Sequence, residues 1–467
     1  MKESIHLRLL ANQTHASIAS KNGLVVDTIK RRLRYNTNNQ ALIEACQKIF
    51  DQKQSLHSAL DVLTDKEPDQ LSILFLLLKR LYQDRAIAID YYIDAIQAGS
   101  LLPMAPMPLI TDVAPLNDEF SLARFAKLHR PHDVLVLEAP LATARLEIQT
   151  DDLAMKVSQW LTKSTSTVES SLLGQLLVST GLGDQILRCD TSTINPSTEL
   201  DGWESHEIFF QFRSRNGFHT YPSGALFQAA GHREPPLANR KRYDSEKRII
   251  LKKPESIKSD TLESVIASRK STRNFQDEQL SISQLSELLW RTMRQTREFS
   301  MTIEDESGQS HIFPLKSRPI PSGGSVHEID AYILINAPGA LQKGLWRYDD
   351  KYHELIIISE ANENTESILL DAQISAGLEC KPPMMLIFSA RFDRMMWKYS
   401  ALSLAAILKH VGILYEIFYL VTTDMGLGVC GLGNGESRSF STAINTHPAV
   451  ESNVGEMLLG IPQERMR

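Results

Sequence analysis

Three short segments of this chain contain side chains and backbone donors that could bind an anion. The first is the run Arg269-Lys270-Ser271-Thr272-Arg273, which places two guanidinium groups, one ammonium group and a hydroxyl close together. Guanidinium and ammonium groups are strong, charge-assisted donors to phosphate oxygens. The alternative is a basic turn that faces solvent and binds nothing. The density of donors favours a phosphate site.

The other two segments are rich in glycine. Pro321-Ser322-Gly323-Gly324 could offer a hydroxyl and successive backbone N–H groups to an oxyanion or a flat ring. Gly426-Leu427-Gly428-Val429-Cys430-Gly431 has the spacing G-x-G-x-x-G, and Gly433 and Asn434 follow it. Because this run comes after a predicted helix and not between a strand and a helix, it does not indicate a dinucleotide-binding fold. Both segments could also be ordinary turns.

The adjacent pair Lys398-Tyr399 could transfer protons. A dry pocket would move the pKa values of these groups and suit them to acid or base chemistry. The alternative is a structural pair at the start of a helix, which is the commoner case for exposed lysines.

Composition excludes several classes of function. The 467 residues favour two to four domains, and the net charge of −6 gives no overall case for nucleic-acid binding. Cys46, Cys189, Cys380 and Cys430 are scattered without the spacing of a metal site, so we expect reduced thiols and no metal. The apolar run 71–78 is too short for a membrane span, and no secretion signal is visible, so we expect a cytoplasmic protein that does not bind membranes.

Hydrophobic periodicity predicts the elements that must position these residues. The segment 22–92 is helical in pattern, and the proline-rich segment 100–131 is expected to be a connection. Strands at 134–137 and 144–148, followed by helices at 153–161 and 170–177, suggest a winged-helix-like module.

From residue 261 onward the pattern is α+β. It predicts a helix at 283–293, strands at 329–335 and 384–388, and a hairpin of 346–348 with 355–358. A long helix is expected at about 400–423, and Ile407, Val411, Leu414 and Phe418 recur on one of its sides. Such a helix belongs to a core or a dimer interface.

Taken in order, the motifs resemble the nitroreductase-like flavin superfamily and, more narrowly, SagB/ThcOx-type azoline oxidases, with cyanobactin oxidases as the nearest subgroup. The segments that carry this resemblance are 268–275, 318–324, the hairpin 344–348, Lys398-Tyr399, 426–428 and 459–462. Two departures concern specificity. The segment 325–328 lacks the aromatic-proline continuation common in relatives, and Glu416 stands where many relatives have glutamine.

The resemblance implies an α+β fold with N-terminal winged-helix-like modules and a C-terminal nitroreductase-like FMN domain. It implies a helical module of winged-helix or leader-recognition type at 1–110, a winged-helix-like module at 130–190, a linker packed on the flavin domain at 200–255, and the oxidase domain at 256–467. It also implies that FMN binds at the interface of a homodimer, and that Pro321, Ser322 and Gly323 reach it from the neighbouring subunit. The other residues that the resemblance assigns to FMN are Arg269, Lys270, Ser271, Arg273, Gly431, Gly433, Asn434 and Arg465.

The function that the resemblance implies is the oxidation of thiazoline or oxazoline rings in a ribosomally made peptide to thiazoles or oxazoles. Lys398 and Tyr399 are the expected catalytic pair, FMN accepts hydride, and oxygen regenerates the flavin. Two alternatives stay open. One is an NAD(P)H-dependent nitro- or quinone reductase, and the other is a peptide-binding scaffold with an inert flavin domain.

Overall fold

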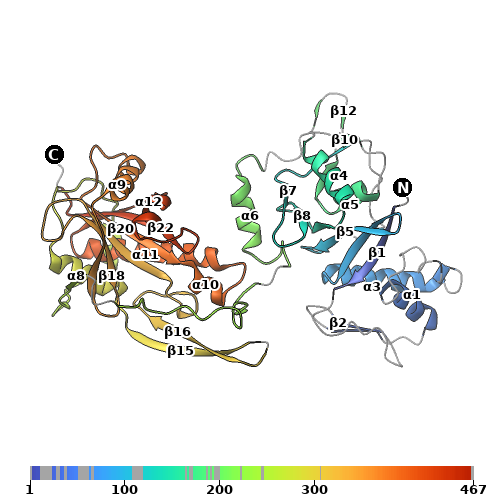
Figure 1. Ribbon diagram of the computed structural model, residues 1–467, viewed down its shortest axis with the longest axis horizontal. Helices are drawn as coiled ribbons and strands as arrows, with labels where there is room; N and C mark the ends of the chain where they lie inside the picture. Colours follow the sequence, from blue (N-terminus) through green and yellow to red (C-terminus); the bar gives the residue numbers. More distant parts are fainter. Residues whose placement is uncertain are drawn as a thin grey trace. The chain divides into compact units, whose positions relative to one another are not determined.

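The computed structural model describes most of the chain. The described residues are 3–10, 24–27, 32–35, 39–50, 61, 63–64, 68–107, 119–162, 166–167, 172–185, 188–189, 192–193, 200–220, 223–242, 247–305 and 307–463. They form two compact units, Met1–Tyr221 and Pro222–Arg467 (Figure 1).

The N-terminal unit is built on a six-stranded antiparallel sheet. Its strand order is β1 (Glu3–Leu9), β4 (Ile87–Ile93), β5 (Ile96–Pro103), β9 (Ala144–Ile148), β8 (Leu135–Glu138) and β7 (Lys127–His129). A small sheet joins β10 (Ser166–Thr167), β6 (Glu119–Leu122) and β11 (Gly183–Gln185), and two hairpins pair β2 (Leu24–Asp27) with β3 (Arg32–Tyr35) and β12 (Arg188–Cys189) with β13 (Ser192–Thr193). The helices are α1 (Gln40–Phe50), α3 (Leu71–Gln83), α4 (Asp151–Thr162), α5 (Leu172–Ser179) and α6 (Ser205–Arg213).

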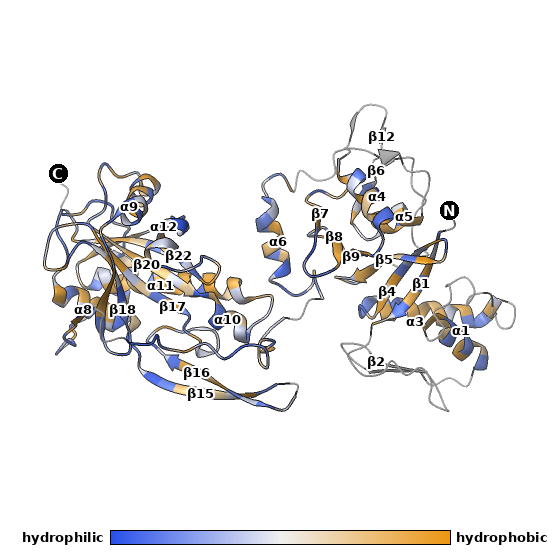
Figure 2. Cartoon of the chain, in the orientation of Figure 1, coloured by the Kyte–Doolittle hydropathy of each residue, from blue (hydrophilic) through white to orange (hydrophobic). Residues whose placement is uncertain are grey.

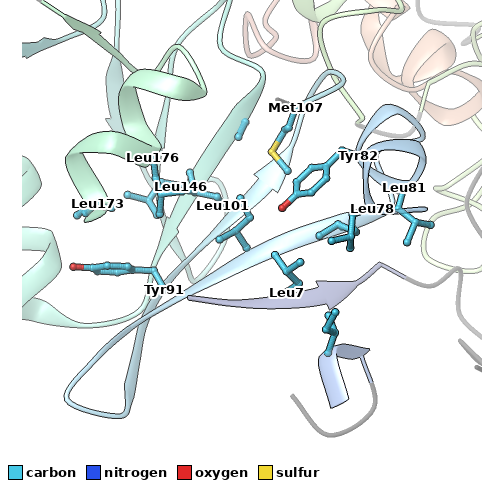
Figure 3. Close-up of a cluster of buried hydrophobic side chains, with 14 of the residues drawn as sticks. Leu7, Leu78, Leu81, Tyr82, Tyr91, Leu101, Met107, Leu146, Leu173 and Leu176 are labelled. Carbon is cyan, nitrogen blue, oxygen red and sulfur yellow. The ribbon is translucent and has the colours of Figure 1, made fainter. Parts of the chain in front are cut away.

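Apolar side chains from helices and sheet form one core in this unit. Figure 3 shows Leu7, Leu101 and Leu146 from the sheet together with Leu78 and Tyr82 from α3. Leu173 and Leu176 of α5 belong to the same cluster. Burial of this continuous apolar surface is the main force that holds the unit together.

The prediction for this unit is right in part. The strands at 134–137 and 144–148 and the helices at 153–161 and 170–177 are confirmed by β8, β9, α4 and α5. The helical interpretation of 22–92 is wrong at both ends. Near its start β2 and β3 form a hairpin, and at its end β4 occupies 87–93 and pairs with strands on both sides. Isoleucine and tyrosine suit a pleated strand, so tertiary pairing decides this segment. The segment 100–131 is also more regular than expected, since it contains the end of β5 and all of β6 and β7.

The C-terminal unit is built on a seven-stranded antiparallel sheet. Its order is β14 (Arg248–Ile250), β19 (Glu354–Glu360), β18 (Gly344–Asp349), β17 (Ile329–Ile335), β20 (Met384–Arg391), β22 (Glu451–Gly460) and β21 (Gly428–Gly431). A separate hairpin consists of β15 (Arg297–Glu304) and β16 (Ser310–Ser317). The helices are α7 (Leu262–Ser268), α8 (Ile282–Met293), α9 (Glu363–Ala376), α10 (Phe392–Lys398), α11 (Ser403–Asp424) and α12 (Ser437–Ala443).

Alternate residues of the central strands face two different helical layers. Ile333 belongs to the cluster that contains α8 and α11. Its neighbours Tyr332 and Leu334 belong to the cluster that contains α9 and α12. Since successive side chains of a strand point to opposite faces, the sheet lies between two pairs of helices and is buried on both faces. The orange colour of β20 and α11 in Figure 2 reflects this apolar composition.

The predicted elements of this unit are confirmed closely. The strand at 329–335 is β17, the hairpin is β18 with β19, and the long helix is α11. Its predicted stripe of Ile407, Val411, Leu414 and Phe418 is buried. By length and composition α11 is also apolar enough to cross a membrane, the one such helix among the described residues. A core helix meets the same criteria, and the buried stripe of α11 packs on the sheet.

Residues 223–242 pack on the C-terminal unit. Arg240 forms ion pairs with Asp330 of β17 at 2.9 Å and with Glu451 of β22. Trp397 of α10 donates its indole N–H to the carbonyl of Arg233 at 3.0 Å. The predicted linker 200–255 therefore contributes to both units, because α6 lies in the N-terminal one. The division into the four predicted segments stays a prediction.

Candidate active site

The basic run 269–273 lies directly against the glycine-rich run 428–431. Helix α7 starts at the N-cap Thr261 and ends at Ser268, so the basic residues follow its last turn. The N–H of Thr272 donates to the carbonyl of Val429 at 2.9 Å. A Cβ atom at Gly428 would lie 2.8 Å from Cγ2 of Thr272. Glycine is therefore required at 428 because the two segments approach so closely.

Tyr419 of α11 connects the same two segments. Its hydroxyl lies 3.0 Å from the hydroxyl of Ser271 and accepts the N–H of Gly431 at 2.8 Å. The guanidinium of Arg269 lies 5.2 Å from the centre of the Tyr419 ring, within the range of a cation–π contact. Sequence reasoning missed Tyr419. The signal that could have found it is its spacing of four residues from Tyr415, which puts both hydroxyls on one side of the helix.

A cavity of about 1000 Å³ opens beside the basic run. It is lined by residues 270–275, 377–383, 462 and 463. Lys270, Ser271 and Arg273 are exposed, so their donors are accessible from this space. The segment 377–383, which follows the left-handed C-cap Gly377 of α9, was not predicted as part of the site.

The loop 431–435 is fixed by hydrogen bonds that involve α11, β22 and α9. Tyr415 donates its hydroxyl to the carbonyl of Leu432 at 3.1 Å and accepts the N–H of Glu456 at 2.8 Å. Ser375 of α9 donates to the side-chain carbonyl of Asn434 at 2.6 Å. Gly433 is exposed and open to solvent. The loop thus presents backbone groups of its glycines on a rigid support.

A buried carboxyl group lies under this loop. Glu456 is 3 % exposed, and a Cβ atom at Gly435 would lie 1.9 Å from one of its carboxylate oxygens. Burial raises the pKa of Glu456 to about 7, and the charges of Asp371 and Glu436 add to the rise. The side-chain amide of Asn453 donates to it and opposes the rise.

The second glycine motif meets the predicted catalytic pair. Nζ of Lys398 donates to the carbonyl of Gly324 at 3.3 Å. A Cβ atom at Gly324 would lie 2.1 Å from that Nζ and 2.7 Å from the Tyr399 hydroxyl. Gly324 has a φ of 57°, a conformation that also favours glycine. Lys398, Tyr399 and Gly324 therefore form one compact group, while Pro321 is exposed at its edge.

The surroundings change the acidity of the pair in opposite directions. Burial lowers the pKa of Lys398 from its usual 10.5. Burial raises the pKa of Tyr399, and the charge of Glu328 raises it further. Both shifts favour the neutral forms, an uncharged amine and a protonated phenol.

His410 of α11 fixes the neighbouring Gly323. The N–H of Gly323 donates to Nε2 of His410 at 2.8 Å, and Nδ1 of His410 lies 2.7 Å from the carboxylate of Glu328. Neither His410 nor Glu328 was singled out as a site residue from the sequence. Their sequence distance of 82 residues hides the contact.

The three predicted motifs therefore form two groups within one chain. The first and third motifs meet at Tyr419, and the second motif meets Lys398 and Tyr399 beside His410. His410 and Tyr419 are nine residues apart on α11, which is about 14 Å and about half a turn around the helix axis. The two groups thus lie on opposite sides of this helix. Arg465 lies outside the described residues.

The C-terminal unit thus has an antiparallel sheet between two helical layers, with a basic loop and glycine turns beside a long central helix. The model of the nitroreductase family matches residues 266–461. The C-terminal unit therefore carries a nitroreductase-family domain. The model of the cyanobactin oxidase ThcOx matches residues 120–220, so the chain combines this domain with a cyanobactin-oxidase-type segment. That segment includes the regions 134–183 and 203–217.

Individual relatives are distant. A nitroreductase-type protein of Methanocaldococcus jannaschii is 23% identical over 172 residues, which are 37% of this chain and 78% of the relative. A nitroreductase-type structure from Ralstonia eutropha is 23% identical with a TM-score of 0.37, covering 52% of this chain and all of that one. The microcin synthetase McbBCD complex of E. coli, solved with truncated pro-MccB17 bound, is 18% identical with a TM-score of 0.34, covering 52% and 88%.

Proteins of the nitroreductase family generally bind FMN. The residues present fit this group. The exposed donors of Lys270, Ser271 and Arg273 line the cavity and suit a phosphate. A Cβ atom at Gly433 would meet nothing within 4 Å, so the glycine loop leaves open space at this residue.

Proposed function

We propose that this protein is an FMN-dependent azoline oxidase that converts thiazoline or oxazoline rings of a ribosomally made peptide into thiazoles or oxazoles. The observation that carries the proposal is the compact group of Lys398, Tyr399 and the Gly323–Gly324 turn in a nitroreductase-family domain. The match of residues 120–220 to the cyanobactin oxidase ThcOx model supports this reading over a general reductase.

The basic run and the glycine loop would hold the cofactor. Lys270, Ser271 and Arg273 would bind the phosphate, and Arg269, stacked on Tyr419, would support them. Gly431, Gly433 and Asn434 would lie along the flat ring, and the open space at Gly433 would let the backbone approach it. Arg465 is a further expected phosphate ligand.

A second copy of the chain would complete the site. Within one chain Ser322 and Gly323 lie on the other side of α11 from Ser271 and Tyr419, so one chain does not surround a ligand with all three motifs. Leu404 and Leu408 on α11 are 40% and 45% exposed, and such an apolar face on a central helix suits burial in a homodimer. Pro321, Ser322 and Gly323 would then reach the flavin of the partner.

Proton chemistry follows from the acidity of the catalytic pair. Burial lowers the pKa of Lys398 and so makes its neutral amine easier to form, which suits the role of the base that removes a proton from the azoline ring. Tyr399 favours its neutral phenol and suits the role of a hydrogen-bond donor to a heteroatom of the azoline ring. FMN, when bound, supplies the acceptor for the hydride that leaves the ring, and oxygen regenerates it.

The N-terminal unit would contact the peptide substrate. It contains the cyanobactin-oxidase-type segment and an edge strand, β1, next to β4. The winged-helix-like character of its modules and the recognition of a leader peptide stay predictions.

The test is to purify the protein, record its visible spectrum and incubate it with an azoline-containing peptide. We expect a yellow protein and the loss of two hydrogen atoms per ring by mass spectrometry. Lys398→Ala should retain flavin but lose about 10²-fold or more in turnover, and Tyr399→Phe should also retain flavin. The exposed Lys343→Ala is the matched control.

Two outcomes would favour the alternatives. Rapid reduction of the flavin by NAD(P)H without peptide, together with an inert azoline peptide, indicates a nitro- or quinone reductase. A colourless protein that still binds peptide indicates a scaffold with an inert domain.

A further inference from the structure

The turn between Ser322 and Glu328 is held in a conformation that most residues avoid. Gly324, Ser325 and His327 have φ values of 57°, 56° and 46°. For serine and histidine this left-handed region is unfavourable, because the Cβ atom approaches the backbone carbonyl. A backbone of this kind persists only when its surroundings over-determine it.

Four hydrogen bonds surround this turn, and Glu328 or His410 takes part in three of them. Nδ1–H of His410 donates to one carboxylate oxygen of Glu328 at 2.7 Å, and the Ser322 hydroxyl donates to the other at 3.3 Å. The Ser322 oxygen accepts the N–H of His327 at 3.0 Å, and Nε2 of His410 accepts the N–H of Gly323 at 2.8 Å.

Burial makes these contacts specific. Glu328 is fully buried and His410 is 8 % exposed, so neither can exchange its partner for water. Because Nε2 of His410 accepts a hydrogen bond, the proton of a neutral ring must sit on Nδ1, where Glu328 receives it. The network therefore selects one tautomer of His410 and one position of the Gly323 amide.

The same turn receives the catalytic pair. Lys398 donates to the carbonyl of Gly324, and the N–H of Arg391, just before α10, donates to the carbonyl of Glu328 at 3.0 Å. Any displacement of the turn would thus move the acceptor of Lys398. The segment 325–328 is Ser-Val-His-Glu, so no proline ring fixes its backbone.

We propose that Glu328 and His410 are positioning residues, which hold the Gly323–Gly324 turn in the shape that receives Lys398 and Tyr399. This inference rests on the proposed function for the role of the pair. The shape of the turn can be measured without substrate, so the two claims can fail separately.

The experiment compares His410→Leu with His410→Gln in the full-length protein. Glutamine can accept the Gly323 N–H through its oxygen and donate to Glu328 through its nitrogen, whereas leucine can do neither. Three properties are measured. They are the hydrogen–deuterium exchange of residues 319–328, the rate at which an amine-reactive reagent labels Lys398, and the separate values of kcat and KM for the azoline peptide.

We expect His410→Leu to accelerate exchange in 319–328 by about five- to tenfold, as for the loss of one buried hydrogen bond, and to label Lys398 faster. The flavin content of His410→Leu should equal that of the wild type. Its kcat should fall by a larger factor than the factor by which its KM changes. His410→Gln should recover most of each property. Unchanged exchange in folded His410→Leu, or a glutamine variant as defective as the leucine variant, would overturn the inference.

A second pair keeps the inference testable if His410→Leu does not fold. Glu328→Gln retains an acceptor for His410 without the charge, so its residues 319–328 should exchange amide hydrogens at the wild-type rate. In Glu328→Leu the same residues should exchange faster. Equal exchange in the two Glu328 variants would contradict the role of this residue. If exchange behaves as expected but no azoline is oxidised by the wild type, the turn is correctly described and the proposed function is wrong.

Discussion

The hydroxyl of Tyr419 lies 3.0 Å from the hydroxyl of Ser271. One side chain on the central helix thereby joins the basic run to the glycine loop, because the same hydroxyl also accepts the N–H of Gly431. Since both partners are expected to contact FMN, this tyrosine couples the phosphate end of the site to its ring end.

Replacing Tyr419 by phenylalanine tests this coupling. The ring would still support Arg269, but both hydrogen bonds of the hydroxyl would be lost. We expect FMN to bind about five- to tenfold more weakly, as measured by quenching of flavin fluorescence. Tyr352→Phe, at an exposed tyrosine, should bind like the wild type. Equal affinity of all three proteins would show that the hydroxyl does not shape the site.

Arg273→Ala should weaken FMN binding more strongly. The exposed guanidinium beside the cavity is a charged donor, and the loss of such a contact to phosphate corresponds to about ten- to hundredfold in affinity. Riboflavin, which has no phosphate, should distinguish the variants less than FMN. Arg438→Ala removes a similar exposed charge on α12 and is the control. The phosphate assignment fails if Arg273→Ala and Arg438→Ala bind FMN equally.

Gly324→Ala should disable the catalytic group. The added methyl group would collide with Nζ of Lys398 and the Tyr399 hydroxyl, and alanine at a φ of 57° costs about 1–2 kcal/mol. We expect flavin to be retained while turnover falls at least about tenfold. Gly308→Ala, at a φ of 81° between β15 and β16 where a methyl group meets nothing within 4 Å, is the control for a glycine replacement. Normal turnover of Gly324→Ala would separate this glycine from catalysis.

The pH dependence of turnover should report the base. If neutral Lys398 removes the ring proton, kcat/KM rises with pH until the amine is deprotonated, and the midpoint lies below 10.5 because burial lowers this pKa. Tyr399→Phe should keep that rising limb, since the phenol acts in its protonated form. If kcat/KM of Lys398→Ala still rises with pH in the same way, another residue is the base.

Glu456 should make stability depend on pH. Its pKa is raised in the fold from 4.5 to about 7, so the folded state binds more protons between these values and stability falls as pH rises through this window. The rise corresponds to about 3 kcal/mol at most. Glu456→Gln should match the wild type in thermal unfolding at pH 4.5 and unfold at a higher temperature at pH 8. The same difference at both pH values would contradict the assignment.

Local sequence pattern was sufficient to predict many helices and strands of the C-terminal unit. The apolar run 329–335, the hairpin and the stripe of Ile407, Val411, Leu414 and Phe418 are short-range features. Burial of a strand on both faces favours an apolar run, and burial of one helix face imposes a period of about 3.6 residues. The composition of the basic run and of the two glycine runs likewise indicated anion and ring contacts before any geometry.

The sequence by itself therefore determined the α+β class of the C-terminal domain and the chemical types present in its motifs. Only the tertiary structure decided which motifs meet. Contacts such as Glu328 with His410 and Ser271 with Tyr419 join residues 82 and 148 positions apart, and no periodicity encodes them. It also decided that β4 is a strand, since its pairing with β1 and β5 forms only in the folded sheet. The acidity of Lys398 and Glu456 was decided in the same way, because burial arises only when distant segments pack together.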